Sequence, residues 1–104
     1  MPRVCAGRLD DLPLARPVLL EIGGRRVALV RLGDVVHALD DVCPHSGGPL
    51  SEGTVRGDTL ACPYHGWVWS LHSGACVAPG RDARVVVYPT RVEAGEVWVE
   101  LPEG

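Results

Sequence analysis

Two short stretches carry most of the information in this chain of 104 residues: CPHSGGPL at positions 43–50 and CPYHGW at positions 62–67. Each holds one Cys and one His at close spacing, as Cys-x-His in the first stretch and Cys-x-x-His in the second. Pro and Gly surround both pairs, which favours tight turns in which backbone N–H groups can approach a sulfur atom. The distinctive chemistry is therefore expected in two loops, at about 40–53 and 62–69.

The two Cys and two His form a candidate metal site. They are Cys43, His45, Cys62 and His65, with sixteen residues between the second and the third. Two thiolates and two imidazoles suit either zinc or an iron–sulfur centre, because both accept mixed sulfur and nitrogen ligation. A classical zinc finger needs two His three to five residues apart, a spacing that this chain lacks. A zinc-binding interaction module remains the alternative, and colour distinguishes it, since zinc proteins are colourless and iron–sulfur proteins are reddish-brown.

The rest of the chain predicts a single all-β domain over 1–104. Short Val- and Leu-rich runs alternate with Gly, Pro and Asp, as strands alternate with turns. The expected strands are 4–9, 16–22, 26–32, 35–39, 84–92 and 97–101, with 54–55 and 59–61 as short β-elements between the loops. Pro89 cannot donate to a ladder and is expected at an edge or a bulge. No window has a helical period, so no helix longer than one turn is expected.

Composition argues against nucleic acid and membrane as partners. The net charge is −3, without a basic block, so nucleic-acid binding is not expected. The longest stretch without Asp, Glu or Arg, 59–80, contains Pro, Gly and His and does not read as a membrane helix. Charged residues also interrupt any signal-like apolar run near position 1. A cytoplasmic location is expected, where Cys residues are more often metal ligands or free thiols than disulfides.

The two stretches and their flanks resemble the Rieske iron–sulfur proteins. Their signature of Cys-x-His, about sixteen residues and Cys-x-x-His is present in full, and the flanks match from Cys43 to Gly53. The resemblance implies a Rieske-like antiparallel β-sandwich or barrel with two loops that bind a [2Fe–2S] cluster. It further implies that Cys43 and Cys62 hold the inner iron, and that His45 and His65 hold the outer iron through neutral ring nitrogens. Neutral ligands raise the potential of the cluster above that of all-Cys ferredoxins.

The chain departs from the high-potential Rieske proteins of respiratory and photosynthetic complexes. Those proteins clamp the two loops with a disulfide at the positions where this chain has Gly48 and Tyr64. They also carry a Ser and a Tyr whose hydroxyls donate to cluster sulfurs, where this chain has Trp67 and Trp69. These two residues cannot supply O–H bonds, which leaves an indole N–H as the alternative donor. Fewer donors stabilise the reduced cluster less. The sequence is therefore similar to the low-potential soluble Rieske ferredoxins.

The resemblance implies an electron carrier rather than an enzyme. In similar proteins a Rieske ferredoxin passes single electrons from a flavin reductase to a terminal oxygenase, so a reductase and an oxygenase or another redox protein are the expected partners. The small Rieske subunit of an assimilatory nitrite reductase is the alternative. A catalytic oxygenase would need a second iron held by two His and a carboxylate. Only His37 and His72 remain for it, with too little chain to build such a domain, so this function is not expected.

The expected docking surface is the tips of the two loops. It consists of uncharged residues: Pro44, Ser46, Gly47, Gly48, Pro49, Leu50, Gly66 and Trp67. Three acidic residues at its rim, Asp40, Asp41 and Glu52, are expected to steer a basic partner.

Several other side chains are expected to be structural. These are two histidines, two small buried thiols and two core tryptophans: His37, His72, Cys5, Cys76, Trp69 and Trp98. Trp69 is expected to pack beneath the second loop.

Overall fold

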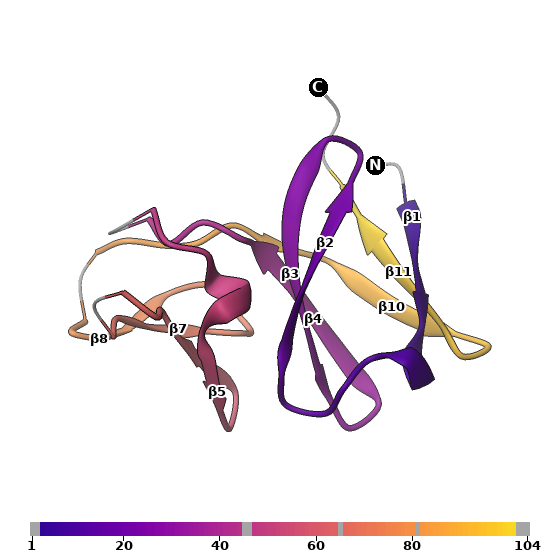
Figure 1. Ribbon diagram of the computed structural model, residues 1–104, viewed down its shortest axis with the longest axis horizontal. Helices are drawn as coiled ribbons and strands as arrows, with labels where there is room; N and C mark the ends of the chain where they lie inside the picture. Colours follow the sequence, from indigo (N-terminus) through magenta and orange to yellow (C-terminus); the bar gives the residue numbers. More distant parts are fainter. Residues whose placement is uncertain (1–2, 45–46, 65, 81, 102–104) are drawn as a thin grey trace.

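The computed structural model describes residues 3–44, 47–64, 66–80 and 82–101. Within these ranges eleven strands form three antiparallel sheets (Figure 1). The only helices there are two single 3-10 turns, Leu9–Asp11 and Leu50–Glu52. None of the helices in this part of the chain is long and apolar enough to cross a membrane. The expected all-β class is confirmed.

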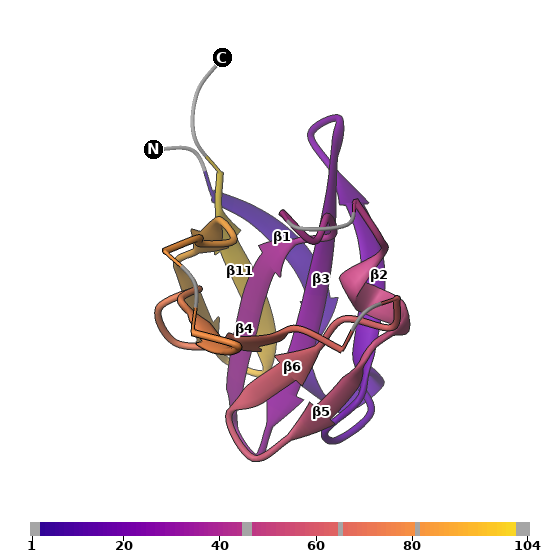
Figure 2. The same ribbon diagram turned by 90° about the vertical axis from the view of Figure 1, so that its left-hand side faces the viewer.

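The strands are short. They are β1 (Arg3–Arg8), β2 (Pro17–Ile22), β3 (Arg25–Leu32), β4 (Val35–Asp40), β5 (Thr54–Arg56), β6 (Thr59–Ala61), β7 (Val68–Ser70), β8 (Cys76–Ala78), β9 (Val87–Tyr88), β10 (Thr90–Glu93) and β11 (Glu96–Glu100). We call the sheet β1-β11-β10 the terminal sheet, the sheet β2-β3-β4-β9 the central sheet, and the sheet β5-β6-β7-β8 the distal sheet. In Figures 1 and 2 the central sheet separates the other two.

The expectation of one continuous strand at 84–92 is wrong. Val87–Tyr88 pairs with β4 in the central sheet, whereas Thr90–Glu93 pairs with β11 in the terminal sheet. Pro89 lies at the change of sheet, where its missing N–H breaks the ladder and its carbonyl accepts the N–H of Glu100 at 2.9 Å. The chain thus uses Pro89 to leave one sheet and enter the next.

Two strands of the distal sheet were not predicted. The expected second loop, 62–69, ends at Trp67, because Val68–Ser70 forms β7 and pairs with β6. The strand β8 then pairs with β7 through a register shift. Both strands have three residues, too few for a visible period of alternation.

The core has two halves that share the strand β3. Four consecutive β3 residues, Val27–Val30, are fully buried. Because successive side chains of a strand point to opposite faces, Ala28 and Val30 join the apolar cluster on the distal side, and Val27 and Leu29 join the one on the terminal side. The central sheet is therefore covered on both faces.

His37 and His72 contact each other where the central and distal sheets meet. Their ring centroids are 4.8 Å apart in an edge-to-face arrangement. His72 Nε2 also lies 3.4 Å from Asp58 Oδ2 at the exposed rim. Burial, followed by the charge of His72, lowers the pKa of His37 below its usual 6.5, so the fold favours neutral His37. The expected structural role of both histidines agrees with this packing.

We expect the free energy of unfolding to fall as the pH drops below 6.5. Unfolded His37 binds a proton at its ordinary pKa, whereas folded His37 binds one only at lower pH. Between these two pKa values the unfolded state therefore binds more protons than the folded state. The contribution of neutral His37 to the free energy of unfolding is fully present above pH 6.5 and is lost as the pH falls through the lowered pKa. Denaturant unfolding of the wild type and of His37→Gln, from about pH 8 to about pH 5, measures this contribution of His37. Identical pH profiles for the two proteins would contradict the assignment.

Candidate metal centre

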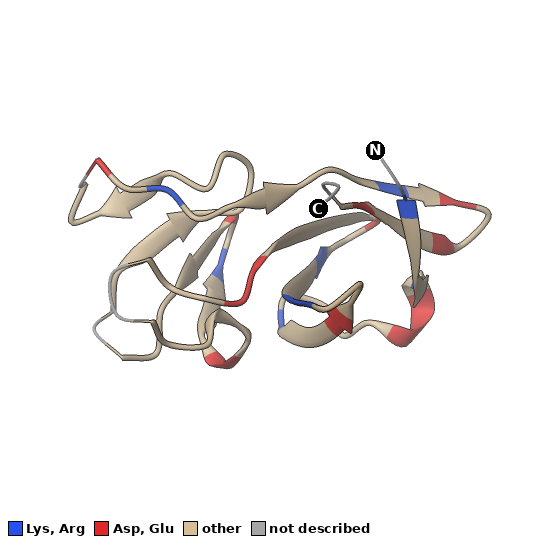
Figure 3. Cartoon of the chain, turned by 90° about the horizontal axis from the view of Figure 1, so that it is seen from above, with Lys and Arg blue, Asp and Glu red and all other residues tan. Residues whose placement is uncertain are grey.

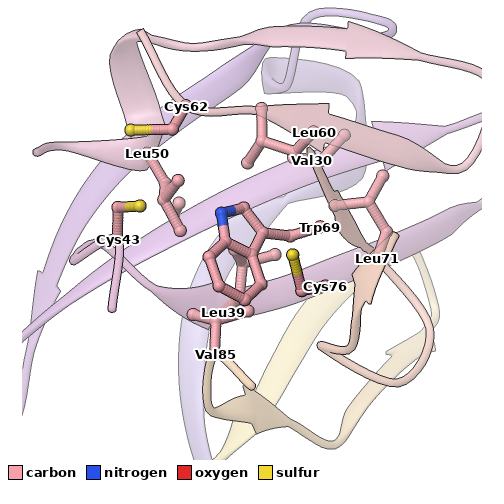
Figure 4. Packing of buried hydrophobic residues seen from close by; sticks show 11 residues of the cluster. Val30, Leu39, Cys43, Leu50, Leu60, Cys62, Trp69, Leu71, Cys76 and Val85 are labelled. Carbon is pink, nitrogen blue, oxygen red and sulfur yellow. The ribbon is translucent and has the colours of Figure 1, made fainter. Parts of the chain in front are cut away.

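The two Cys-containing loops lie side by side at the distal end of the molecule. The first connects β4 to β5 and the second connects β6 to β7 (Figure 2). Cys43 is 1% exposed and Cys62 is 3% exposed, and both belong to the apolar cluster that contains Leu50 and Trp69. Figure 4 shows the two thiols on the side of the Trp69 ring that carries Nε1, with Cys76 on the other side. The fold thus brings together two thiols that are nineteen positions apart in sequence.

Each cysteine is held by the same two backbone hydrogen bonds. The Cys43 N–H donates to the Gly48 carbonyl at 2.9 Å, and the Cys43 carbonyl accepts the Gly47 N–H at 2.8 Å. In the second loop the Cys62 N–H donates to the Trp67 carbonyl at 2.8 Å, and the Cys62 carbonyl accepts the Gly66 N–H at 3.1 Å. The two turns close at the same offsets from their cysteines.

A glycine closes each turn because the turn requires a left-handed backbone. Gly47 has φ +75° and Gly66 has φ +73°, a region that residues with a Cβ rarely enter. Of the predicted site residues, the structure describes Cys43 and Cys62 and brings them into one cluster. The other two, His45 and His65, lie outside the described residues. In sequence each falls inside one of the two closed turns.

The two loops meet at Gly48 and Tyr64. A Cβ at Gly48 would lie 2.9 Å from Tyr64 Cδ2 and 3.0 Å from Tyr64 Cγ, so the aromatic ring occupies the space directly above the glycine. These are the two positions where the resemblance to high-potential Rieske proteins places a disulfide. In this chain an aromatic ring packed on a glycine joins the loops instead.

A buried carboxylate fixes the start of the first loop. The Asp41 side chain is fully buried, and its Oδ1 accepts the Ser51 N–H at 2.6 Å. The Arg26 guanidinium lies 3.7 Å from Asp41 Oδ2, and the Asp41 N–H donates to the Arg26 carbonyl at 3.1 Å. Asp41 therefore ties together both ends of the segment that carries Cys43.

The expectation that Asp41 steers a partner from the rim is wrong, because its carboxylate is enclosed by the loop that it holds. Asp40 is half-buried and accepts the Tyr88 hydroxyl at 2.7 Å, so of the three acidic residues only Glu52 is exposed. Sequence reasoning missed the structural role of Asp41. No local signal reveals it, since its partners are Arg26 of β3 and Ser51, ten positions further along the chain.

Four further expectations have mixed outcomes. Trp69 is completely buried beneath the loops and Cys76 is buried, as expected. Cys5, in contrast, is exposed on β1. Trp98 is only half-buried, with the guanidinium of Arg3 5.0 Å above its ring. Cys5 and Trp98 are paired across β1 and β11 on the outer face of the terminal sheet, where alternation along each strand turns them away from the core.

The residues present fit a sulfur-bound metal group. Two buried thiols converge from hydrogen-bonded turns, and no described residue accepts a hydrogen bond from the buried indole Nε1–H of Trp69. Among the described residues no three His, Cys, Asp or Glu side chains gather as a metal site. Thiolates can hold an iron–sulfur cluster, and an N–H donor can hydrogen-bond to one of its sulfurs.

The sequence model of the Rieske [2Fe-2S] domain family matches residues 2–89. The chain belongs to this Rieske family. Ferredoxin CarAc of Metapseudomonas resinovorans is 35% identical over 97 residues, which cover 93% of this chain and 90% of that protein. The predicted [2Fe–2S] cofactor is thereby confirmed, and the zinc alternative is superseded.

Solved structures agree with this membership. The ferredoxin of carbazole 1,9a-dioxygenase from Nocardioides aromaticivorans IC177 superposes with a TM-score of 0.89 at 28% identity, covering 95% of this chain and 97% of that one. A putative NADH-dependent nitrite reductase small subunit from Mycobacterium tuberculosis superposes with a TM-score of 0.86 at 33% identity, covering 94% and 93%.

A complex of reduced oxygenase and oxidised ferredoxin in carbazole 1,9a-dioxygenase also contains a matching chain, with a TM-score of 0.85, 28% identity and coverage of 93% and 100%. Relatives that are ferredoxin subunits confirm the prediction of an electron carrier that is not itself a catalyst.

We expect Gly48→Ala to destabilise the contact between the loops. Gly48 has an ordinary φ, so the added methyl group acts through its overlap with the Tyr64 ring rather than through backbone strain. Overpacking of this kind costs about 1–3 kcal/mol, and the exposed Tyr64 ring can move, which favours the lower end. The thermal midpoint of the cluster-loaded protein, followed by visible absorption, measures the loss.

Tyr64→Ala supplies the matched control for this variant. In that background the three atoms nearest to the methyl group of Gly48→Ala are gone, so its penalty is expected to fall. An equal penalty in both backgrounds would show that the contact between Gly48 and Tyr64 does not join the loops.

Proposed function

We propose that this Rieske protein carries single electrons from a reductase to a terminal oxygenase. Its [2Fe–2S] cluster is bound by the thiolates of Cys43 and Cys62 on one iron and by the imidazoles of His45 and His65 on the other. The observation that carries this proposal is the pair of matching turns, each closing around a buried cysteine and each containing one of the two histidines in sequence. The cluster supplies reversible uptake of one electron.

The protein side of this chemistry is the exclusion of water and the fixing of the ligands. Cys43 and Cys62 are each held by two backbone hydrogen bonds, so their sulfurs move little between oxidation states. Leu50 and Trp69 cover the thiols from within the core. A low-dielectric environment with fixed donors limits the reorganisation that accompanies a change of charge.

The exposed end of the loops is uncharged and suits a transient redox partner. Pro44, Gly47, Tyr64 and Gly66 are exposed there, next to half-exposed Val42. Figure 3 shows the Arg, Asp and Glu residues mainly on other parts of the chain. Redox encounters bury small interfaces, typically below about 1,200 Å².

The docking surface is smaller than the sequence predicts. Gly48 and Leu50 are buried and Trp67 is half-buried, so these three residues support the tip from below rather than forming its surface.

A nitrite reductase complex is the second candidate. The similarity to the putative nitrite reductase small subunit from Mycobacterium tuberculosis favours it, at 33% identity over nearly the whole of both chains. The two candidates require the same cluster and differ only in the protein that accepts the electron.

We also propose a cytoplasmic location and a potential in the lower part of the Rieske range. A reducing compartment keeps a thiol such as exposed Cys5 reduced. The low potential stays a prediction that rests on Trp67 and Trp69, which offer no hydroxyl donors.

Cys62→Ala is expected to abolish the cluster, whereas Cys76→Ala is expected to retain it. Both residues are buried cysteines of the same apolar cluster, so the second variant controls for the loss of a buried thiol. Metal binding and folding are coupled, so removal of a ligand also loosens the loops. Iron content and the visible spectrum of the purified proteins measure the outcome. A Cys62→Ala protein with a full iron complement would refute the ligand set.

The carrier role predicts reversible uptake of one electron per chain and its rapid delivery to an oxygenase. Spectroelectrochemical titration measures the uptake. Stopped-flow mixing of the reduced protein with the oxidised oxygenase of carbazole 1,9a-dioxygenase measures the delivery, and a nitrite reductase large subunit forms the second arm. Re-oxidation by the oxygenase supports the first candidate. Re-oxidation by the nitrite reductase large subunit alone supports the second. A protein that is not reversibly reduced is not a carrier.

A further inference from the structure

Trp69 carries a buried hydrogen-bond donor for which no described residue provides an acceptor. Its side chain is 0% exposed, and within 3–44, 47–64, 66–80 and 82–101 its Nε1 has no hydrogen-bond partner. Of the side chains that the structure describes, the other buried polar atom without such a partner is Asp41 Oδ2, which has the Arg26 guanidinium at 3.7 Å. Among these described atoms the indole N–H is the one with neither a hydrogen bond nor a nearby charge. A buried donor without an acceptor is costly, which points to an acceptor outside the described residues.

The fold fixes the direction of this donor. Trp69 is the central residue of β7, paired with Leu60 on one side and Cys76 on the other, so its side chain points into the core between the sheets. Figure 4 shows Leu71 and Cys76 along one side of the indole, while Nε1 faces the opposite side, where Cys43, Leu50 and Cys62 lie. The donor is aimed at the region of the two thiols.

We propose that the Trp69 Nε1–H donates a hydrogen bond to a sulfur of the [2Fe–2S] cluster or of its cysteine ligands, and that this bond raises the reduction potential. The inference rests on the proposed ligand set. Reduction adds a negative charge to the cluster, which makes its sulfurs better acceptors. A fixed donor therefore stabilises the reduced form more than the oxidised form.

The other two tryptophans are not equivalent to Trp69. Trp67 is half-buried, and its ring lies 6.1 Å from that of Trp69 between centroids. Trp98 lies on β11 in the terminal sheet, with Arg3 over its ring. Trp98 thus provides a matched control that has the same side chain but no access to the loops.

The first test is the potential of Trp69→Phe, measured by protein-film voltammetry. The variant keeps an aromatic ring in the core and removes the N–H. We expect a loss of a few-fold to about tenfold in the equilibrium constant for reduction, and a tenfold loss corresponds to a potential about 59 mV lower. Trp98→Phe is expected to leave the potential unchanged. Both variants are compared only after their iron content and visible spectrum match those of the wild type.

A second test needs no change at Trp69. Wild-type protein labelled with ¹⁵N at the indole nitrogen, studied by pulsed electron–nuclear double resonance of the reduced cluster, is expected to show a ¹⁵N coupling. The coupling is expected to persist in labelled Trp67→Phe. This measurement tests the hydrogen bond from Trp69 Nε1 even if Trp69→Phe fails to bind its cluster.

The outcomes separate this inference from the proposed function. An unchanged potential in cluster-loaded Trp69→Phe, the absence of an indole coupling, or a coupling that disappears in Trp67→Phe overturns the role of Trp69 and leaves the carrier proposal intact. The electron–nuclear double resonance spectrum of the reduced wild-type cluster is also expected to show nitrogen couplings from two histidine ligands. Their absence overturns the ligand set itself.

Discussion

The distal sheet is stable because it packs against the central sheet. Its four strands have three residues each, too few to be stable alone. Leu60, Trp69 and Leu71 pack against Ala28 and Val30 of the central sheet, and this contact holds the distal sheet in place. The second cysteine loop is a connection within that sheet, and the first loop leads into it. The relative position of the two thiols therefore depends on a tightly packed apolar contact rather than on a covalent link.

The strand β3 makes this arrangement rigid. Because Val27–Val30 are buried on both faces, the same backbone supports the loops on one side and the terminal sheet on the other. The terminal sheet is fastened to the central one by the Thr90 hydroxyl, which donates to the Val36 carbonyl. A small protein that needs an accurately placed metal group thus uses most of its residues as a support for two loops.

The features that were predictable from the sequence are those with local signals. Alternating Val and Leu predicted β2, β3 and β4 closely, and Cys, His, Gly and Pro at fixed spacing predicted both loops. The errors came from contacts between distant segments. Nothing near Asp41 reveals that Arg26 and Ser51 will enclose it, and nothing near Pro89 shows that its two neighbouring strands belong to different sheets.

The exposed thiol of Cys5 has a practical consequence. It lies on β1, at the end of the molecule opposite the cysteine loops (Figure 1), while Cys43, Cys62 and Cys76 are all buried. A gold surface or a maleimide reagent will therefore meet Cys5 first. Attachment there turns the loops away from the support and leaves them open to solution. The natural sequence thus provides a handle for oriented immobilisation on an electrode, without an engineered residue.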